Sequence, residues 1–255
     1  MPETDLKLLT NAAQQASVIA LKYWKSDQRV IRKPDNSPVS EGDLAVDKFL
    51  REYLTAARPD YGWISEETED DKTRLSRDSV FIVDPIDGTR AYVDGQTTWA
   101  HSIAVTHKGR PTAAVIYLPA REKLYTAAIG QGAHLNGQPI TTGTRTDPDG
   151  ATVLAPKPSL DAQYWRDLPA LERHFRPALA YRFCLVAEGR FDVMLTLKDA
   201  WEWDIAAGTL IAEEAGAVVT DRDGQKHQFN GENPKSKGVF TAAPDLHKAL
   251  MARYI

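Results

Sequence analysis

An apolar run that ends abruptly in two aspartates, a proline and a glycine constrains this chain more than any other feature. Residues 79–84 read Ser-Val-Phe-Ile-Val-Asp, the apolar and β-branched pattern of a buried strand. Pro85 and Gly88 break the run, so Asp84 and Asp87 stand three residues apart on a tight turn. Two carboxylates placed in this way can aim at one point, and oxygen ligands suit a hard cation such as Mg²⁺.

The same turn offers backbone groups to a ligand. The Ile86 carbonyl, freed from strand pairing, is available as a further oxygen ligand, and Gly88 permits close backbone approach. The amides at Gly88 and Thr89 could open a helix and face an anion. Two alternatives stand beside a cation site. The motif alone is equally compatible with a polar turn of no function. The aspartyl-nucleophile phosphatases space their two acids by two residues, which differs from the spacing here.

Three further segments carry acids near predicted element ends. Glu66 and Glu67 follow a short strand, although the acidic run after them also fits a solvated loop. Asp204 opens a helix of small residues, where it can cap the helix, bind a metal, or do both. Asp43 and Lys33 lie in a segment leading into a helix, which would explain Asp43 without a functional role and leave Lys33 as a surface charge.

Composition excludes several classes of protein. The 255 residues suffice for one or two domains and a substantial core. The net charge of -4 gives no overall attraction to polymeric nucleic acid or to an anionic membrane. No apolar run is long enough to predict a membrane span, and the acidic N-terminus lacks signal-peptide features. The single cysteine, Cys184, cannot form an internal disulfide, so we expect a cytoplasmic protein.

Hydrophobic periodicity predicts a mixture of strands and helices in two halves. We expect helices at about 4–25, 40–57, 182–189, 203–215 and 244–253. We expect strands at about 62–65, 79–84, 99–107, 112–118, 124–129, 151–155, 217–220 and 238–242, with a further short strand between the turns near 130–137. A polar stretch at 142–150 is the best linker candidate. The pattern therefore predicts two packed α/β layers divided into residues 1–145 and 146–255.

Taken together, the four segments resemble the inositol monophosphatase superfamily of magnesium-dependent sugar and nucleotide phosphatases. The matches occur in family order: Glu-Glu, then Asp-Pro-Ile-Asp-Gly-Thr, then Trp-Asp-x-Ala-Ala-Gly. The resemblance spans roughly residues 5–250. It implies an α/β fold, a layered αβαβα sandwich with an α+β N-terminal half, and family members are often homodimers.

The resemblance also implies a set of metal ligands. Glu66, Asp84 and the Ile86 carbonyl match the ligands of a first Mg²⁺. Asp84, Asp87 and Asp204 match those of a second. Two or three Mg²⁺ ions per site are therefore expected, and the activity implied is hydrolysis of a small phosphate ester by water.

Other matched residues are implied to act on the reactants. Glu66 and Thr89 match the residues that orient the attacking water. Asp43 matches an acid near a third, weaker metal, where it could also support Thr89. The amides of Gly88 and Thr89 match the phosphate-holding groups. A member that binds metal and phosphate without turnover is the alternative from another class, and the presence of the complete ligand set argues against it.

The substrate is less constrained than the reaction. Residues 33–39 and 183–189, preceded by Arg182, resemble the bacterial 3′(2′),5′-bisphosphate nucleotidase branch, although residues 178–181 depart from its Gly-Ser-Ser-like run. Inositol monophosphatases carry a glutamate where this chain has Leu197, which cannot accept a hydroxyl hydrogen bond. Arg182 or Lys198 could meet a second phosphate, or either could be a plain surface charge. We therefore expect adenosine 3′,5′-bisphosphate as substrate, with inositol 1-phosphate and histidinol phosphate as alternatives.

Overall fold

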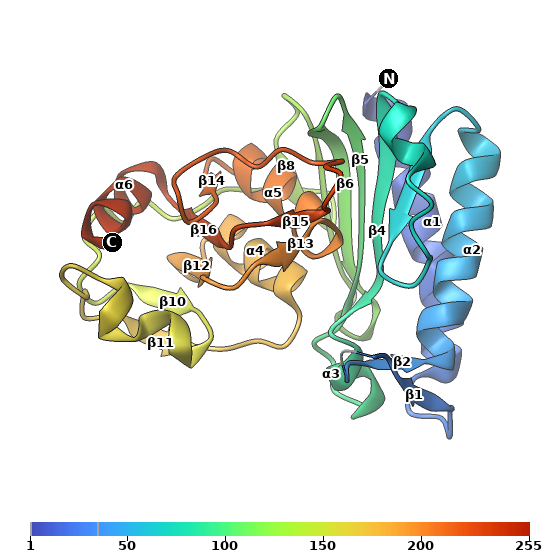
Figure 1. The fold of residues 1–255 in the computed structure, drawn as a ribbon, viewed down its shortest axis with the longest axis horizontal. Coiled ribbons are helices and arrows are strands. Elements are labelled where there is room, and N and C mark those ends of the chain that lie inside the picture. The colour runs from blue at the N-terminus through green and yellow to red at the C-terminus, as the bar shows by residue number, and fades with distance from the viewer. Residues whose placement is uncertain (1, 35) are drawn as a thin grey trace.

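A computed structural model describes residues 2–34 and 36–255 of the chain, arranged in five alternating layers of helix and sheet (Figure 1). Asp35, part of the segment that resembles the nucleotidases, lies outside the described residues. The layers confirm the predicted αβαβα sandwich. The main helices are α1 (Pro2–Tyr23), α2 (Glu41–Ala57), α3 (Thr89–Val93), α4 (Leu179–Ala187), α5 (Glu202–Glu214) and α6 (Pro244–Arg253). None of these described helices is long and apolar enough to cross a membrane.

The larger sheet has seven strands in the order β3-β4-β5-β6-β7-β8-β9. All neighbouring pairs are antiparallel except β3 and β4, which run parallel. Antiparallel neighbours that follow one another in the chain therefore make up most of this sheet. The strands are β3 (Gly62–Ser65), β4 (Ser79–Asp87), β5 (Ala100–His107), β6 (Arg110–Leu118), β7 (Lys123–Ala128), β8 (Ala133–Leu135) and β9 (Gln138–Ile140).

The smaller sheet has five strands in the order β11-β10-β12-β16-β14 and mixes parallel with antiparallel pairs. Its strands are β10 (Thr152–Leu154), β11 (Glu172–His174), β12 (Val193–Thr196), β14 (Val218–Thr220) and β16 (Val239–Ala242). Two small antiparallel pairs complete the fold: β1 (Val30–Arg32) with β2 (Pro38–Ser40), and β13 (Ala200–Trp201) with β15 (Lys235–Ser236).

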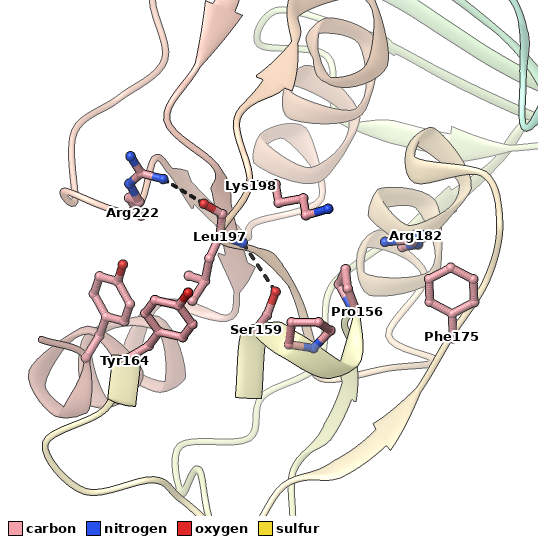
Figure 2. Close-up of a pocket in the computed structure, with 10 residues that line it drawn as sticks. Pro156, Ser159, Tyr164, Phe175, Arg182, Leu197, Lys198 and Arg222 are labelled. Carbon is pink, nitrogen blue, oxygen red and sulfur yellow. Dashed lines mark hydrogen bonds between the residues drawn. The ribbon is translucent and has the colours of Figure 1, made fainter. Parts of the chain in front are cut away.

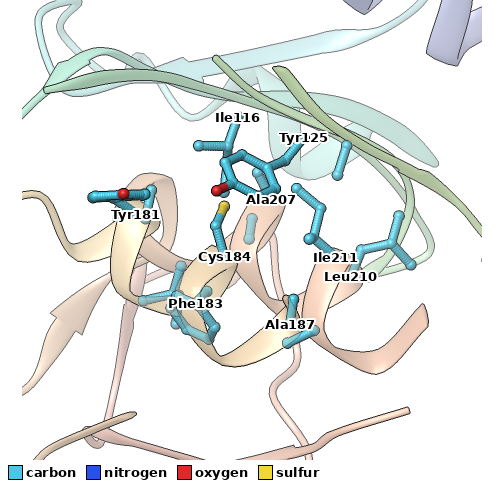
Figure 3. Packing of buried hydrophobic residues seen from close by; sticks show 14 of the residues in the cluster. Ile116, Tyr125, Tyr181, Phe183, Cys184, Ala187, Ala207, Leu210 and Ile211 are labelled. Atoms are coloured by element: carbon cyan, nitrogen blue, oxygen red, sulfur yellow. The ribbon is translucent and has the colours of Figure 1, made fainter. Parts of the chain in front are cut away.

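Three apolar clusters hold the layers together. One joins α1 and α2 to the larger sheet and includes Leu9, Leu50 and Phe81. The second packs α4 and α5 between the two sheets, where Figure 3 shows Cys184 close to the Tyr125 ring. The third joins the smaller sheet to α6. The second cluster is what brings residues from distant parts of the chain to the end of β4.

The sequence predicted most elements but not all. The helices at 40–57, 203–215 and 244–253 are confirmed within a few residues, as are the strands of the larger sheet except β9, which was not predicted. β12 was not predicted, although it lies at the centre of the smaller sheet, because its four residues, Val-Met-Leu-Thr, are few and show no alternation of apolar and polar side chains. The helix predicted from 182 begins at Leu179 instead, for a reason that lies in the site.

Candidate metal centre

A bulge at the end of β4 shapes the predicted turn. Pairing with β5 shifts between Asp84 and Asp87, so that Pro85 and Ile86 together face the single residue His101. The bulge removes the carbonyls of Pro85 and Ile86 from regular strand pairing. The Ile86 amide donates to Oδ1 of Asp84 at 3.0 Å, which fixes that carboxylate on the turn.

Three carboxylates converge beside the bulge. Oxygen atoms of Asp84, Asp87 and Asp204 lie within 4.8 Å of one another, although Asp204 comes from α5, far along the chain. Burial raises the pKa of both Asp84 and Asp204 well above the usual range, and neighbouring carboxylates raise both further. Buried groups of like charge are unfavourable unless a proton or a cation compensates them. The all-oxygen donor set fits a hard divalent cation such as Mg²⁺.

Asp87 has a second contact that the sequence did not reveal. Its Oδ1 accepts the Leu179 amide at 3.1 Å, and its Oδ2 accepts the Ala180 amide at 2.6 Å. These are the first free amides of α4, whose N-cap residue Ala178 has no side-chain oxygen. Burial raises the pKa of Asp87 to about 7, even though these two amides and Arg182 act in the opposite direction. Asp87 therefore caps α4 across more than ninety residues, which explains why this helix begins earlier than its sequence predicts.

The acidic pair after β3 is held by a lysine. Lys33 Nζ lies 2.9 Å from Glu66 Oε1 and 2.8 Å from Glu67 Oε1. Burial alone would lower the pKa of Lys33, but the two carboxylates outweigh it and raise that pKa to about 12. Lys33 is thus half-buried and paired, and the alternative of a plain surface charge is wrong. The Glu66 side chain is 24% exposed and that of Glu67 only 3%, so Glu66 is the more accessible of the two.

Asp43 and Thr89 form the other side of the centre. Asp43 Oδ2 accepts both the Ser40 amide and the Ser40 hydroxyl, completing a capping box at the start of α2. Its Oδ1 remains free of the cap and accepts the Thr89 hydroxyl at 3.1 Å. Burial raises the pKa of Asp43 to about 6, with the Glu66 charge adding to the rise. Helix capping therefore explains only one oxygen of Asp43, and the other faces the site.

Gly88 provides the sharp change of direction between β4 and α3. Its φ is +90°, a conformation that side-chain-bearing residues adopt only with strain. A Cβ here would also lie 3.3 Å from both the Ala178 Cβ and the Thr98 carbonyl. Beside it, a cavity of about 370 Å³ is lined by Ser37, Pro38, Glu66, Gly88, Thr89, Arg90, Ala91, Asp94, Gln96, Phe175 and Pro177.

A second cavity, here called the basic cavity, has a volume of about 560 Å³ and shares Phe175 with the first. Figure 2 shows the Lys198 amine directed toward Arg182 across this space. Within residues 2–34 and 36–255, Lys198 makes no hydrogen bond or ion pair. The charged side chains of the lining are all basic. The full lining is Pro156, Pro158, Ser159, Tyr164, Phe175, Arg182, Leu197, Lys198, Arg222 and Tyr254.

Arg182 connects the basic cavity to the carboxylates. It is 5% exposed, its Nε donates to the Arg176 carbonyl at 2.6 Å, and its guanidinium lies 4.4 Å from the centre of the Phe175 ring. Burial lowers its pKa to about 10, while the charges of Asp87 and Asp204 act to raise it. Arg182 remains positively charged at neutral pH, so it is a rigid cation between the carboxylates and the basic cavity.

Comparison with known proteins identifies the family of this chain. The model of the inositol monophosphatase family matches residues 1–255. The chain is 32% identical to a histidinol-phosphatase of Chlorobaculum parvum, with 97% of this chain and 95% of that protein covered. It is 30% identical to the Nus factor SuhB of Escherichia coli K12, covering 97% and 94%. Its fold matches that of an inositol monophosphatase from Thermotoga maritima with a TM-score of 0.84 at 22% identity, covering 99% and 96%. The chain belongs to the inositol monophosphatase family, and it is a phosphoric monoester hydrolase of that family.

The structure thus gathers the predicted residues into one region and adds others. Four groups that were not predicted to act here contact the carboxylates or their turn: Lys33, the Leu179 and Ala180 amides, and His101. A lysine in the segment before a capped acid was a usable signal for the Lys33 pair. Nothing local pointed to the α4 amides, because their partner is Asp87.

Proposed function

We propose that the protein is a Mg²⁺-dependent phosphomonoesterase that uses water, without a protein nucleophile. The proximity of the Asp84, Asp87 and Asp204 carboxylates, the first two of them buried, is the observation that carries this proposal. Glu66, Asp84 and the Ile86 carbonyl would hold one Mg²⁺, and Asp84, Asp87 and Asp204 a second. When bound, Mg²⁺ makes a water more acidic and offsets the charge that develops on the phosphoryl oxygens.

The chain's own residues would position the reactants. Thr89 donates its proton to Asp43, so its hydroxyl oxygen is free to accept a hydrogen bond from the attacking water. Glu66 lines the same cavity and would hold that water from a second side, while Asp43 could also support a third, weaker Mg²⁺. The amides of Gly88 and Thr89 would bind the phosphate. In this scheme residues 1–145 supply most ligands, and residues 146–255 supply Asp204 and the residues that select the substrate.

For the substrate we propose adenosine 3′,5′-bisphosphate, with Arg182 and Lys198 binding its second phosphate. The all-basic charge of the cavity lining supports an anionic leaving group. Histidinol carries an ammonium group, which these cations would repel, and Leu197 cannot accept a hydrogen bond from an inositol hydroxyl. Histidinol phosphate remains the second candidate, because a histidinol-phosphatase is 32% identical over nearly the whole chain.

Two assays test these proposals separately. Phosphate release is measured with Mg²⁺ and with EDTA, and a lack of Mg²⁺-dependent release from every sugar or nucleotide ester would refute the reaction. A panel of adenosine 3′,5′-bisphosphate, inositol 1-phosphate and histidinol phosphate then ranks the substrates by kcat/KM. Lys198→Met should lower kcat/KM for the bisphosphate about tenfold, since hydrogen bonds to charged groups contribute about 1.5–3 kcal/mol. Lys248→Met, on the exposed face of α6, is the matched control and should change nothing.

We further propose that the enzyme acts on this small molecule in the cytoplasm as a homodimer, with no polymeric nucleic acid as partner. The net charge of -4 supports the last point, and the family resemblance supports the dimer. Light scattering after size-exclusion chromatography would show whether the mass is one or two times 28.3 kDa.

A further inference from the structure

His101 is a buried histidine that the proposed reaction does not use. It lies in β5, is fully buried, and packs edge-on against the Trp99 ring with the ring centres 5.7 Å apart. Its Nδ1 lies 2.5 Å from the Pro85 carbonyl. A carbonyl can only accept, so Nδ1 carries the proton and Nε2 carries the lone pair. Within the part of the chain that the structure describes, Nε2 has no hydrogen-bond partner.

The position of this hydrogen bond gives it a consequence for the metal centre. Pro85 and Ile86 are the two bulge residues that face His101, and neither carbonyl is held by regular pairing there. Successive carbonyls of an extended chain point to opposite sides. Fixing the Pro85 carbonyl on His101 therefore directs the Ile86 carbonyl to the other side, where its oxygen lies 3.3 Å from the Thr89 hydroxyl.

We infer that His101 is a positioning residue that sets the direction of the Ile86 carbonyl, and thereby the geometry of the metal-binding turn. Simple packing is the competing explanation. A leucine would fill most of the same space without burying an unpaired nitrogen, and burying such a nitrogen away from water destabilises the fold. The imidazole thus buries an unpaired Nε2, which is unfavourable. The hydrogen bond to Pro85 explains why a histidine stands here, whereas packing alone does not. Burial lowers the pKa of His101 to about 4, so the neutral donor form persists at neutral pH.

Two substitutions separate the explanations. His101→Leu keeps most of the volume and removes the donor. His101→Asn loses volume but keeps an amide nitrogen bonded to Cγ, where it can still donate to Pro85. Ile103→Ala is the control for general destabilisation, because it creates a cavity on the same face of β5 as His101. If His101→Leu does not fold, His101→Met replaces it as a flexible side chain without a donor.

The measurement is direct binding of Mn²⁺ to metal-free protein. The electron paramagnetic resonance signal of the free ion monitors the binding, at a temperature well below the melting temperature of each variant. We expect His101→Leu to weaken binding by about tenfold or more, the usual effect of losing an outer contact to a ligand. His101→Asn and Ile103→Ala should stay close to wild type despite lower melting temperatures. The inference is overturned if His101→Leu binds Mn²⁺ as tightly as His101→Asn does. It is also overturned if the loss of affinity in His101→Leu is no larger than the loss in Ile103→Ala.

The inference rests on the proposed metal role of the turn, and the two fail differently. If wild-type protein does not bind Mn²⁺, the metal role itself is wrong. If wild-type protein binds and His101→Leu binds equally well, only the positioning role is wrong. A matching fall in kcat for His101→Leu, recovered in His101→Asn, would extend the result from binding to turnover.

Discussion

Replacing Asp87 with asparagine should remove the part of the pH dependence of stability that Asp87 causes in the metal-free protein. Burial raises the pKa of Asp87 from an ordinary 3.8 to about 7. A carboxyl whose pKa is higher in the folded than in the unfolded protein stabilises the fold fully below its unfolded pKa, and this stability is lost as the pH rises through the folded pKa. At about 1.36 kcal/mol per pKa unit, ionising Asp87 without a cation costs about 4 kcal/mol.

The assay is thermal unfolding of wild type and Asp87→Asn in EDTA from about pH 5 to about pH 8. Only about two of the three pKa units of this loss fall between about pH 5 and about pH 8, which corresponds to about 3 kcal/mol. For a chain of this size, 1 kcal/mol corresponds to about 2–4 °C, so the wild-type melting temperature should fall by about 6–12 °C relative to the variant. The variant can accept only one of the two α4 amides and loses about 1 kcal/mol at every pH. Burial lowers the pKa of His101 and of His227 to about 4, so both histidines change stability with pH in the opposite sense. Their contribution is the same in both proteins and cancels in the difference between the two melting temperatures.

Mg²⁺ should restore the stability of wild type at the upper end of this range and have a smaller effect on Asp87→Asn, because a cation compensates the ionised carboxylates. Asp60→Asn removes an exposed carboxylate and should follow wild type throughout. Parallel curves for wild type and Asp87→Asn in EDTA would refute the reasoning, since they would show no energetic cost of charge at this site. In the activity assay, Asp87→Asn should lower turnover by orders of magnitude with the fold intact.

Three further substitutions test separate contacts. Thr89→Ala should lower kcat by about 10²-fold or more while Thr89→Ser retains most activity, because only the hydroxyl is proposed to position water; equal activities would contradict this role. Lys33→Met should lower the Mg²⁺ concentration needed for half-maximal activity, since its ammonium no longer competes for Glu66, and an increase would show that Lys33 assists metal binding instead. Gly208→Ala should destabilise the fold by about 1–3 kcal/mol in denaturant unfolding, because its Cβ would lie 2.4 Å from the Phe183 ring, and unchanged stability would show that α4 and α5 can separate freely.

Features with a local physical cause could be predicted from the sequence. The capping box at Ser40 and Asp43 involves residues three apart, so it fixed the start of α2 correctly. The break after residues 79–84 predicted both a strand end and two convergent acids, and the acid spacing argued against an aspartyl nucleophile. These signals are local because periodicity, caps and turns depend on neighbouring residues.

Contacts between distant residues were decided by the tertiary fold alone. Packing of α4 and α5 between the sheets brings Asp204 to Asp84 and lets Asp87 cap α4, and no local pattern encodes either contact. The same reason explains the wrong start of α4: its cap is supplied from β4, so the residues before Leu179 carry no signal. The family resemblance supplied the third carboxylate by analogy, whereas the structure supplies its position.

The sequence by itself predicted a cation site at residues 84–89, through the types and spacing of its acids, and most of the elements that carry it. The family resemblance of the whole set of motifs implied the reaction. The fold decided how those acids are held: Asp84 and Asp87 lie close to Asp204, burial raises the pKa of all three carboxylates, and the charged residues that line the neighbouring cavity are all basic. Residue identity sets which groups can bind a cation or donate a proton. Burial and long-range proximity set the energy of those groups, and both exist only once the layers pack.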